Sequence, residues 1–80
     1  MQLNVEQALQ RAVAAQKKGN LNEAENIYRA ILRSEPNQPF ANHNLGVIAV
    51  SLNLAGEALL LFKTALDANP SVEQFWVSYV

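Results

Sequence analysis

The sequence predicts an all-α fold in which short antiparallel helices are stacked in pairs as a solenoid. Three observations predict it. Apolar and small residues recur at the i, i+3, i+4 spacing of amphipathic helices. β-Branched residues are sparse and no stretch alternates for long, so strands are not expected. The pattern also returns after 34 residues without a gap, as in the pairs Ala24 and Ala58, Tyr28 and Phe62, and Pro36 and Pro70.

The first predicted helix begins after Asn4. Asn4 and Gln7 have the spacing of a capping box, in which two side chains satisfy free backbone N–H groups at a helix start. Lys17 and Lys18 come in the last turn, where the helix dipole favours positive charge. Gly19 can take the left-handed conformation that ends a helix, so we expect the helix to stop there.

The second predicted helix follows at once. Asn20 with Glu23 repeats the capping spacing, and Pro36 ends the helix nearby because proline cannot continue it. Its apolar stripe consists of Ala24, Ile27, Tyr28, Ile31 and Leu32.

The second period repeats this order. Asn37 precedes a third helix, and Asn53 stands where Gly19 stood, which suits asparagine because it tolerates positive φ. Leu54 replaces the capping asparagine of the first period, so the start of the fourth helix is weakly specified. Pro70 ends that helix.

The chain closes on an aromatic segment. Ser71 with Gln74 gives a third capping signature, which predicts a last helix that starts a third unit. We expect Phe75, Trp76 and Tyr79 to cover the end of the second unit, with the Trp76 ring buried against the fourth helix.

Composition excludes several classes of protein. Six basic and seven acidic residues give a net charge of −1, which is not the basic face that nucleic-acid binding needs. No cysteine is present, so neither disulfides nor thiolate metal sites are expected. The charge-free run from Pro36 to Gly56 holds prolines, asparagines and a histidine, which argues against a membrane span. No signal peptide is visible, and we expect a cytoplasmic location.

The repeat resembles the tetratricopeptide repeat family. Leu45-Gly46, Ala58, Phe62, Ala65 and Pro70 stand at that family's spacing in the second period. The resemblance implies one domain over residues 1–80, with repeats at 5–38 and 39–72 and the start of a third at 73–80. It also implies structural roles for Ala12, Ala24, Tyr28, Pro36, Gly46, Ala58, Phe62, Ala65, Pro70 and Trp76.

The resemblance further implies a partner-binding surface. In this family the first helix of each pair lines a concave groove where partner peptides usually lie. By spacing, that groove would hold Leu9, Gln10, Val13, Lys17, Phe40, His43, Asn44 and Val47. We therefore expect a non-catalytic protein–protein interaction module, a peptide-binding scaffold from a longer protein.

No catalytic or cofactor site is expected. His43 is the only histidine and has no acidic neighbour on its face, so a metal role is not predicted. Glu23 and Glu25 are two residues apart and point in different directions on a helix. No base, nucleophile and orienting group converge, and we predict no enzyme activity for this chain.

Two other functions stay open. Three stretches resemble the repeats that precede the catalytic domains of bacterial O-linked N-acetylglucosamine transferases: EAENIYRAIL, HNLGVIA and LFKTALDANP. This resemblance implies that the region would present substrate to such a catalytic domain. Leu59 and Leu60 align with polar Glu25 and Asn26 of the first period. Such apolar surface on the second repeat and the last helix predicts a contact patch for another domain or for a second copy of the chain in a homodimer.

Overall fold

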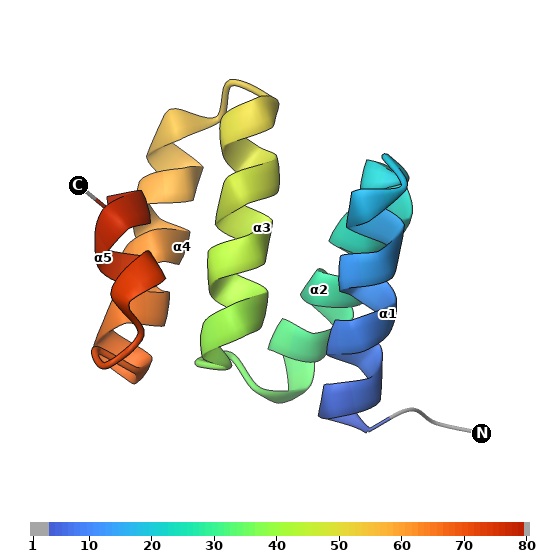
Figure 1. Cartoon of the computed structure of the whole chain (residues 1–80), viewed down its shortest axis with the longest axis horizontal. Coiled ribbons are helices and arrows are strands. Elements are labelled where there is room, and N and C mark those ends of the chain that lie inside the picture. Colours follow the sequence, from blue (N-terminus) through green and yellow to red (C-terminus); the bar gives the residue numbers. More distant parts are fainter. Residues whose placement is uncertain (1–3, 80) are drawn as a thin grey trace.

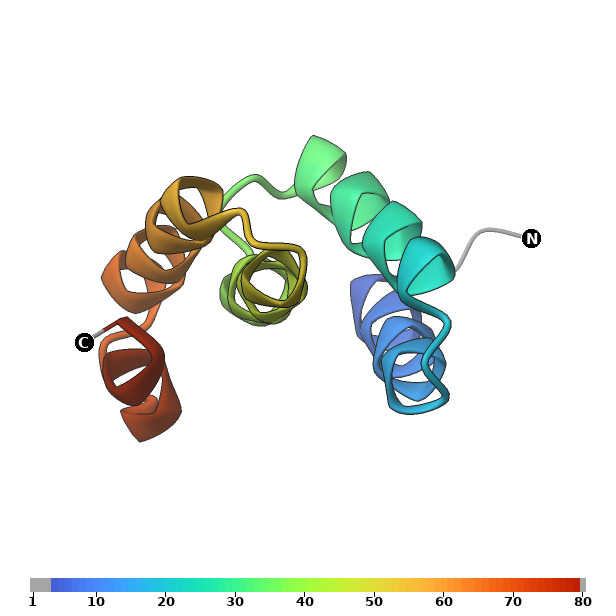
Figure 2. The same cartoon turned by 90° about the horizontal axis from the view of Figure 1, so that it is seen from above.

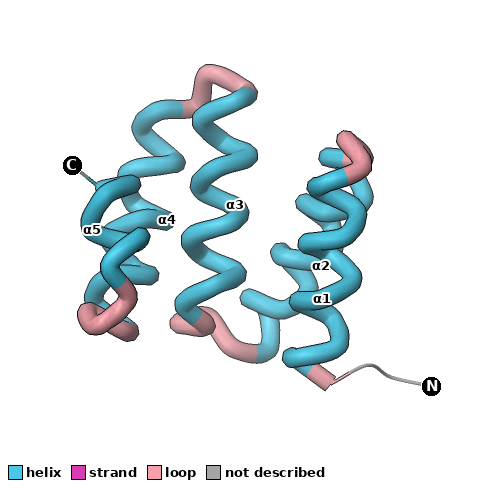
Figure 3. Tube along the Cα trace, in the orientation of Figure 1, coloured by secondary structure: helices cyan, strands magenta, loops and turns pink. Residues whose placement is uncertain are grey.

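The computed structural model describes residues 4–79, which form five helices and no strand (Figures 1 and 3). The helices are α1 (Val5–Lys17), α2 (Leu21–Ser34), α3 (Pro39–Ser51), α4 (Ala55–Ala68) and α5 (Glu73–Tyr79). The predicted all-α fold is confirmed. The predicted first repeat lies within the described residues, whereas residues 1–3 and 80 of the predicted domain lie outside them.

The helices form two layers of an arc. α1 packs on α2 and α3 on α4, while α2 contacts α3 and α4 contacts α5. Seen from above, α1, α3 and α5 lie along the inner side of the arc and α2 and α4 along its outer side (Figure 2). The molecule measures 37 × 24 × 19 Å. Helices α1 and α5 lie at opposite ends of its long axis (Figure 1).

Some of the helix caps predicted from the sequence form in the structure and others do not. The capping box of Asn4 and Gln7 is formed in both directions, with Asn4 Oδ1 accepting from the Gln7 N–H at 2.7 Å. Asn20 is the N-cap residue of α2, as predicted, but its side chain makes no capping hydrogen bond there. At α3 the side chain of Gln38 accepts from the Ala41 N–H. Leu54 provides no side-chain cap for α4, as expected.

The third capping signature is wrong. α5 begins at Glu73, and the Ser71 hydroxyl donates to Asn69 Oδ1 at 2.7 Å. This hydrogen bond holds the turn between α4 and α5, so the short polar side chain serves the loop rather than the helix start.

Both predicted left-handed stops are confirmed. Gly19 has a φ of 83° and Asn53 a φ of 61°. Asn53 is the single non-glycine residue with positive φ among residues 4–79. Asparagine accepts this conformation at lower cost than most side chains, which explains why it can replace glycine between α3 and α4.

Small residues allow each pair of helices to pack closely. Ala12, Ala24, Ala58 and Ala65 are buried, and Tyr28 and Phe62 fill the space beside them. These residues therefore lie in the core, and the structural roles expected for them stay predictions. Pro36 and Pro70 lie in the turns after α2 and α4.

Trp76 departs from its predicted role. Its side chain is 50% exposed, and its indole N–H donates to the Pro70 carbonyl at 2.8 Å. Phe75, at 1% exposure, is the aromatic residue that α5 buries against the second pair. One residue along a helix turns the side chain by about 100°, so burial of Phe75 turns Trp76 away.

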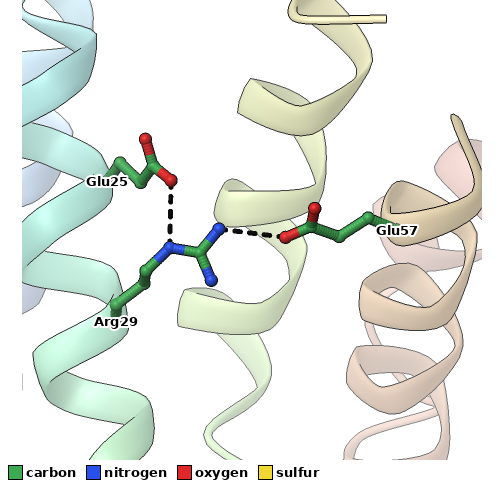
Figure 4. Close-up of polar contacts among 3 residues, drawn as sticks. All are labelled: Glu25, Arg29 and Glu57. Carbon is green, nitrogen blue, oxygen red and sulfur yellow. Dashed lines mark hydrogen bonds and ion pairs between the residues drawn. The ribbon is translucent and has the colours of Figure 1, made fainter. Parts of the chain in front are cut away.

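An ion pair joins the two helix pairs on the outer layer. Arg29 of α2 contacts Glu25 one turn earlier and Glu57 of α4, each at 2.9 Å (Figure 4). The hydrogen bonds to Glu57 and then to Glu25 raise the pKa of Arg29. None of the described helices is long and apolar enough to cross a membrane.

Candidate functional site

An open groove of about 410 Å³ lies between α1 and α3, two neighbouring helices of the inner layer. Its volume is within the usual range of ligand sites in proteins. It is lined by Leu9, Gln10, Val13, Ala14 and Lys17 of α1 and by Phe40 and Asn44 of α3.

Helical spacing brings these side chains to one face. Leu9, Val13 and Lys17 follow one another at intervals of four residues, and side chains at that spacing lie above one another on a helix. Phe40 and Asn44 have the same spacing on the facing helix. Two parallel rows of side chains thus form the two walls.

The groove is mainly apolar with a few polar groups. Phe40 is 44% exposed although its ring also contacts Phe75, at 5.5 Å between centroids. Gln10 and Asn44 add amide groups, and Lys17 is the one charged residue in the lining. This combination offers apolar contact area, amide hydrogen bonds and a single positive charge at the end of α1.

Tyr28 lies behind the groove in the outer layer. Its hydroxyl donates to Gln16 Oε1 at 2.9 Å, and its side chain is fully buried. Burial raises the pKa of Tyr28, while the side chain of Asn44 opposes that rise.

His43 is not a groove residue, which corrects the prediction. It is 4% exposed, and its ring stacks on Phe75 at 5.0 Å and lies 5.4 Å from the ring of Phe62. Nε2 is 2.7 Å from Ser78 Oγ of α5, and Nδ1 is 3.2 Å from Asn44 Oδ1. The physical reason is that α5 covers the face of α3 on which His43 stands.

Of the other residues predicted for the groove, all but one line it. Val47 is 40% exposed on α3 but does not line the groove. Ala14 lines it and was not predicted. Its position four residues after Gln10, on the groove face, was the signal that could have identified it. The remaining predicted residues, Leu9, Gln10, Val13, Lys17, Phe40 and Asn44, all line the groove.

Candidate metal ligands do not cluster in the part of the chain that the structure describes. No group of three or more histidine, cysteine, aspartate or glutamate side chains comes together there. The polar groups that do meet at the inner layer are the amides and the imidazole described above, which suit hydrogen bonding to a partner or within the fold.

Comparisons with known proteins bear on the first helix pair. The family model described as tetratricopeptide repeat matches residues 8–38, which include most of α1 and all of α2. No curated protein and no solved structure matches the chain. The match covers one repeat, and the number of repeats stays a prediction. The chain thus contains a tetratricopeptide repeat at residues 8–38, and the predicted resemblance to that family is confirmed.

Proposed function

We propose that this chain is a protein–protein interaction module that binds a peptide segment of its partner in the groove between α1 and α3. Tetratricopeptide repeats generally mediate contacts between proteins. The single observation that carries the proposal is the open apolar groove, with its amides and one lysine, on the inner face of the arc.

The physical basis is a division of labour between apolar and polar groups. Burial of Leu9, Val13 and Phe40 by a partner would supply the affinity, at about 25 cal/mol per Å² of apolar surface removed from water. The amides of Gln10 and Asn44 would fix the position of the peptide backbone, because an amide offers both a donor and an acceptor.

A peptide-display selection against the whole chain tests this function. A random peptide library would be selected on the wild type and on Val13→Arg, which places a long charged side chain in the groove. Val13 lines the groove but does not belong to the main core cluster, so the variant should fold. We expect the wild type to enrich peptides that Val13→Arg does not bind.

Val50→Arg is the matched control. Val50 is exposed on α3 and does not line the groove, so this variant should retain all selected peptides. If no peptide is enriched, or if Val13→Arg retains the enriched peptides, the proposed function is wrong. Circular dichroism spectra of both variants would verify that they fold alike.

Self-association is a second candidate function, favoured by the distribution of exposed apolar residues. Nine large hydrophobic side chains are exposed among residues 4–79, and all of them lie between Phe40 and Val77. Leu59, Leu60, Trp76 and Val77 belong to α4 and α5 and include the most exposed ones. Analytical ultracentrifugation would give a concentration-dependent dimer that Leu60→Glu weakens. A strict monomer at high concentration would exclude it.

The role predicted from the glycosyltransferase resemblance, presentation of substrate to a catalytic domain, stays a prediction, as does a cytoplasmic location. A selected peptide ligand would be compatible with either the scaffold or the substrate-presenting role, because both use the same groove.

A further inference from the structure

The chain places α5 on the second helix pair as it places α3 on the first. The side chain of Asn42 in α3 donates to the carbonyl of Pro36 at 3.0 Å. The indole N–H of Trp76 in α5 donates to the carbonyl of Pro70 at 2.8 Å. Both partners of the second bond stand 34 residues after those of the first, which is the repeat period. The faces of α3 and α5 can therefore be compared residue by residue.

One face of the helices α2 and α3 is covered by the helices that follow. The buried ring of His43 in α3 is stacked on Phe75 of α5. On α2, Arg29 bonds Glu25 and also reaches Glu57 of α4, each at 2.9 Å. These contacts identify the face through which one helix pair receives the next.

The corresponding face of α4 and α5 is apolar, and no described helix covers it. Val77 is the counterpart of His43 and is 68% exposed. Leu59 is the counterpart of Glu25 and is 51% exposed. We name Leu59, Val77 and the half-exposed Trp76 the C-terminal face. Because α4 and α5 pack on each other at one end of the arc (Figure 2), this face forms that end.

The opposite end of the arc is polar. On α3, Ala41 and Leu45 are buried in the same core cluster as Tyr28 of the preceding helix α2. Their counterparts on α1 are the exposed residues Gln7 and Arg11, which we name the N-terminal face. A helix stacked on this face would bury Arg11, which has no ion-pair partner among the described residues. Burial of an unpaired charge is costly, so the N-terminal face is suited to solvent.

The difference between the two faces decides how copies of the chain can meet. A head-to-tail contact would set Leu59 and Val77 of one copy against Arg11 of the next. A contact between two C-terminal faces sets apolar side chains against apolar side chains and removes both sets from water. Such a contact uses the same surface on both copies and is complete with two of them.

We propose that two copies of the chain bind each other through their C-terminal faces in a closed two-fold dimer. This proposal rests on self-association, the second candidate function, and names the surface and the symmetry of the contact. Leu59 and Val77 of each copy are buried in the contact, while both N-terminal faces point into solvent. The groove between α1 and α3 lies outside the contact, so a dimer carries two grooves.

Leu59→Glu tests the surface, and Leu52→Glu is its matched control. The two leucines are 51% and 49% exposed, and Leu52 lies in the turn after α3, beside Glu25 and Arg29 of α2. Leu59→Glu should fold, because glutamate occupies the equivalent position 25 of α2. Amide spectra of both variants would verify that α5 stays docked through Phe75.

Sedimentation equilibrium measures the effect of the two variants. We expect the wild type to form a concentration-dependent dimer and no larger species. Leu59→Glu should weaken the dimer at least about tenfold, because a charge in an apolar contact loses its hydration. Leu52→Glu should change dimerisation by no more than about twofold, as for a surface substitution outside the contact.

A spin label tests the symmetry. The chain has no cysteine, so Asp67→Cys on the exposed side of α4 accepts a single nitroxide label. The labelled chain is mixed with ¹⁵N-labelled wild type, and amides of one copy that lie near the label of the other are broadened. We expect broadening in α4 and α5 that disappears when the nitroxide is reduced. The 37 Å length of the molecule separates these helices from α1.

The outcomes separate this proposal from self-association itself. Broadening of α1 amides, or species larger than a dimer, would indicate a head-to-tail contact and overturn the two-fold dimer alone. Equal weakening by Leu59→Glu and Leu52→Glu would place the contact elsewhere and also leave self-association standing. A strict monomer at high concentration would overturn both.

Discussion

Gly46 of α3 lies against the ring of Phe62 in α4 so closely that a Cβ atom at position 46 would come within 2.5 Å of Phe62 Cε1. Real Cβ contacts are never this short, so one of the two helices would have to move or the ring would have to turn. Phe62 is buried and also neighbours His43, which leaves its ring little freedom. The pair therefore sets the distance between α3 and α4.

Gly46→Ala should destabilise the chain. Overpacking of a core costs about 1–3 kcal/mol, whereas replacing glycine by alanine within a helix returns at most about 1 kcal/mol. Because the buried ring of Phe62 cannot swing into solvent, we expect the overpacking cost to exceed the gain in helix propensity. The net loss of unfolding free energy should be about 1–2 kcal/mol. Urea unfolding followed by circular dichroism would measure it.

Gly56→Ala is the matched control. Gly56 lies in the first turn of α4 and has no atom within 4 Å of the added Cβ. The same substitution should therefore stabilise the chain by about 0.5–1 kcal/mol through helix propensity and unfolded-state entropy. Equal effects of the two substitutions would contradict the close approach at Gly46.

Phe75→Ala should be much more costly than Trp76→Ala. Phe75 is buried against His43 and Phe40, and removal of a buried phenylalanine costs about 3–5 kcal/mol. Trp76 is half exposed, and its loss removes one hydrogen bond to Pro70, worth about 1 kcal/mol. Chemical denaturation of the two variants would establish the order. The reverse order would show that α5 docks through the indole.

Local sequence signals predicted the two left-handed turns, whereas two predicted side-chain caps did not form and packing decided which side chains are exposed. The turns at Gly19 and Asn53 were predictable because the ability to adopt a positive φ depends on the residue type itself. His43 and Trp76 were misplaced because their exposure depends on which face of α5 meets α3, and a shift of one residue changes that face. No local signal in the sequence marks this register.

The groove shows the same division. Helical spacing was sufficient to place Leu9, Val13 and Lys17 on one face of α1. The size of the groove was not predictable from that spacing, because it depends on how far apart α1 and α3 lie when both pack on α2.

Alkaline pH should destabilise the chain through Tyr28. The unfolded tyrosine has a pKa of about 10, and burial raises the pKa of Tyr28 in the folded chain. The folded state therefore holds the phenolic proton more tightly. The resulting stability is complete below pH ~10 and is lost as the pH rises through the folded pKa. Tyr28→Phe removes this dependence.

Urea unfolding at a series of pH values from neutral to above 10 would check this expectation. Tyr28→Phe should cost about 1 kcal/mol at neutral pH, because the hydrogen bond to Gln16 is lost. Its stability should then fall less steeply than that of the wild type above pH ~10. Lysines titrate in the same range in both proteins, so the difference between the profiles isolates Tyr28. Parallel profiles would contradict the buried neutral phenol.

The Arg29–Glu57 ion pair should contribute little, and its contribution should depend on salt. Both side chains are substantially exposed, and exposed pairs are worth about 0.2–1 kcal/mol. Glu57→Gln should therefore lower the unfolding free energy by no more than this at low salt.

Glu23→Gln is the control, because Glu23 is the counterpart of Glu57 in the first turn of α2 and has no ion pair among the described residues. Both substitutions lose the same interaction with a helix dipole, so their difference reports the bond between the two helix pairs. The difference should shrink in 1 M salt, where charges are screened over about 3 Å. A difference that persists there would mean that Glu57 holds α4 by packing and not by charge.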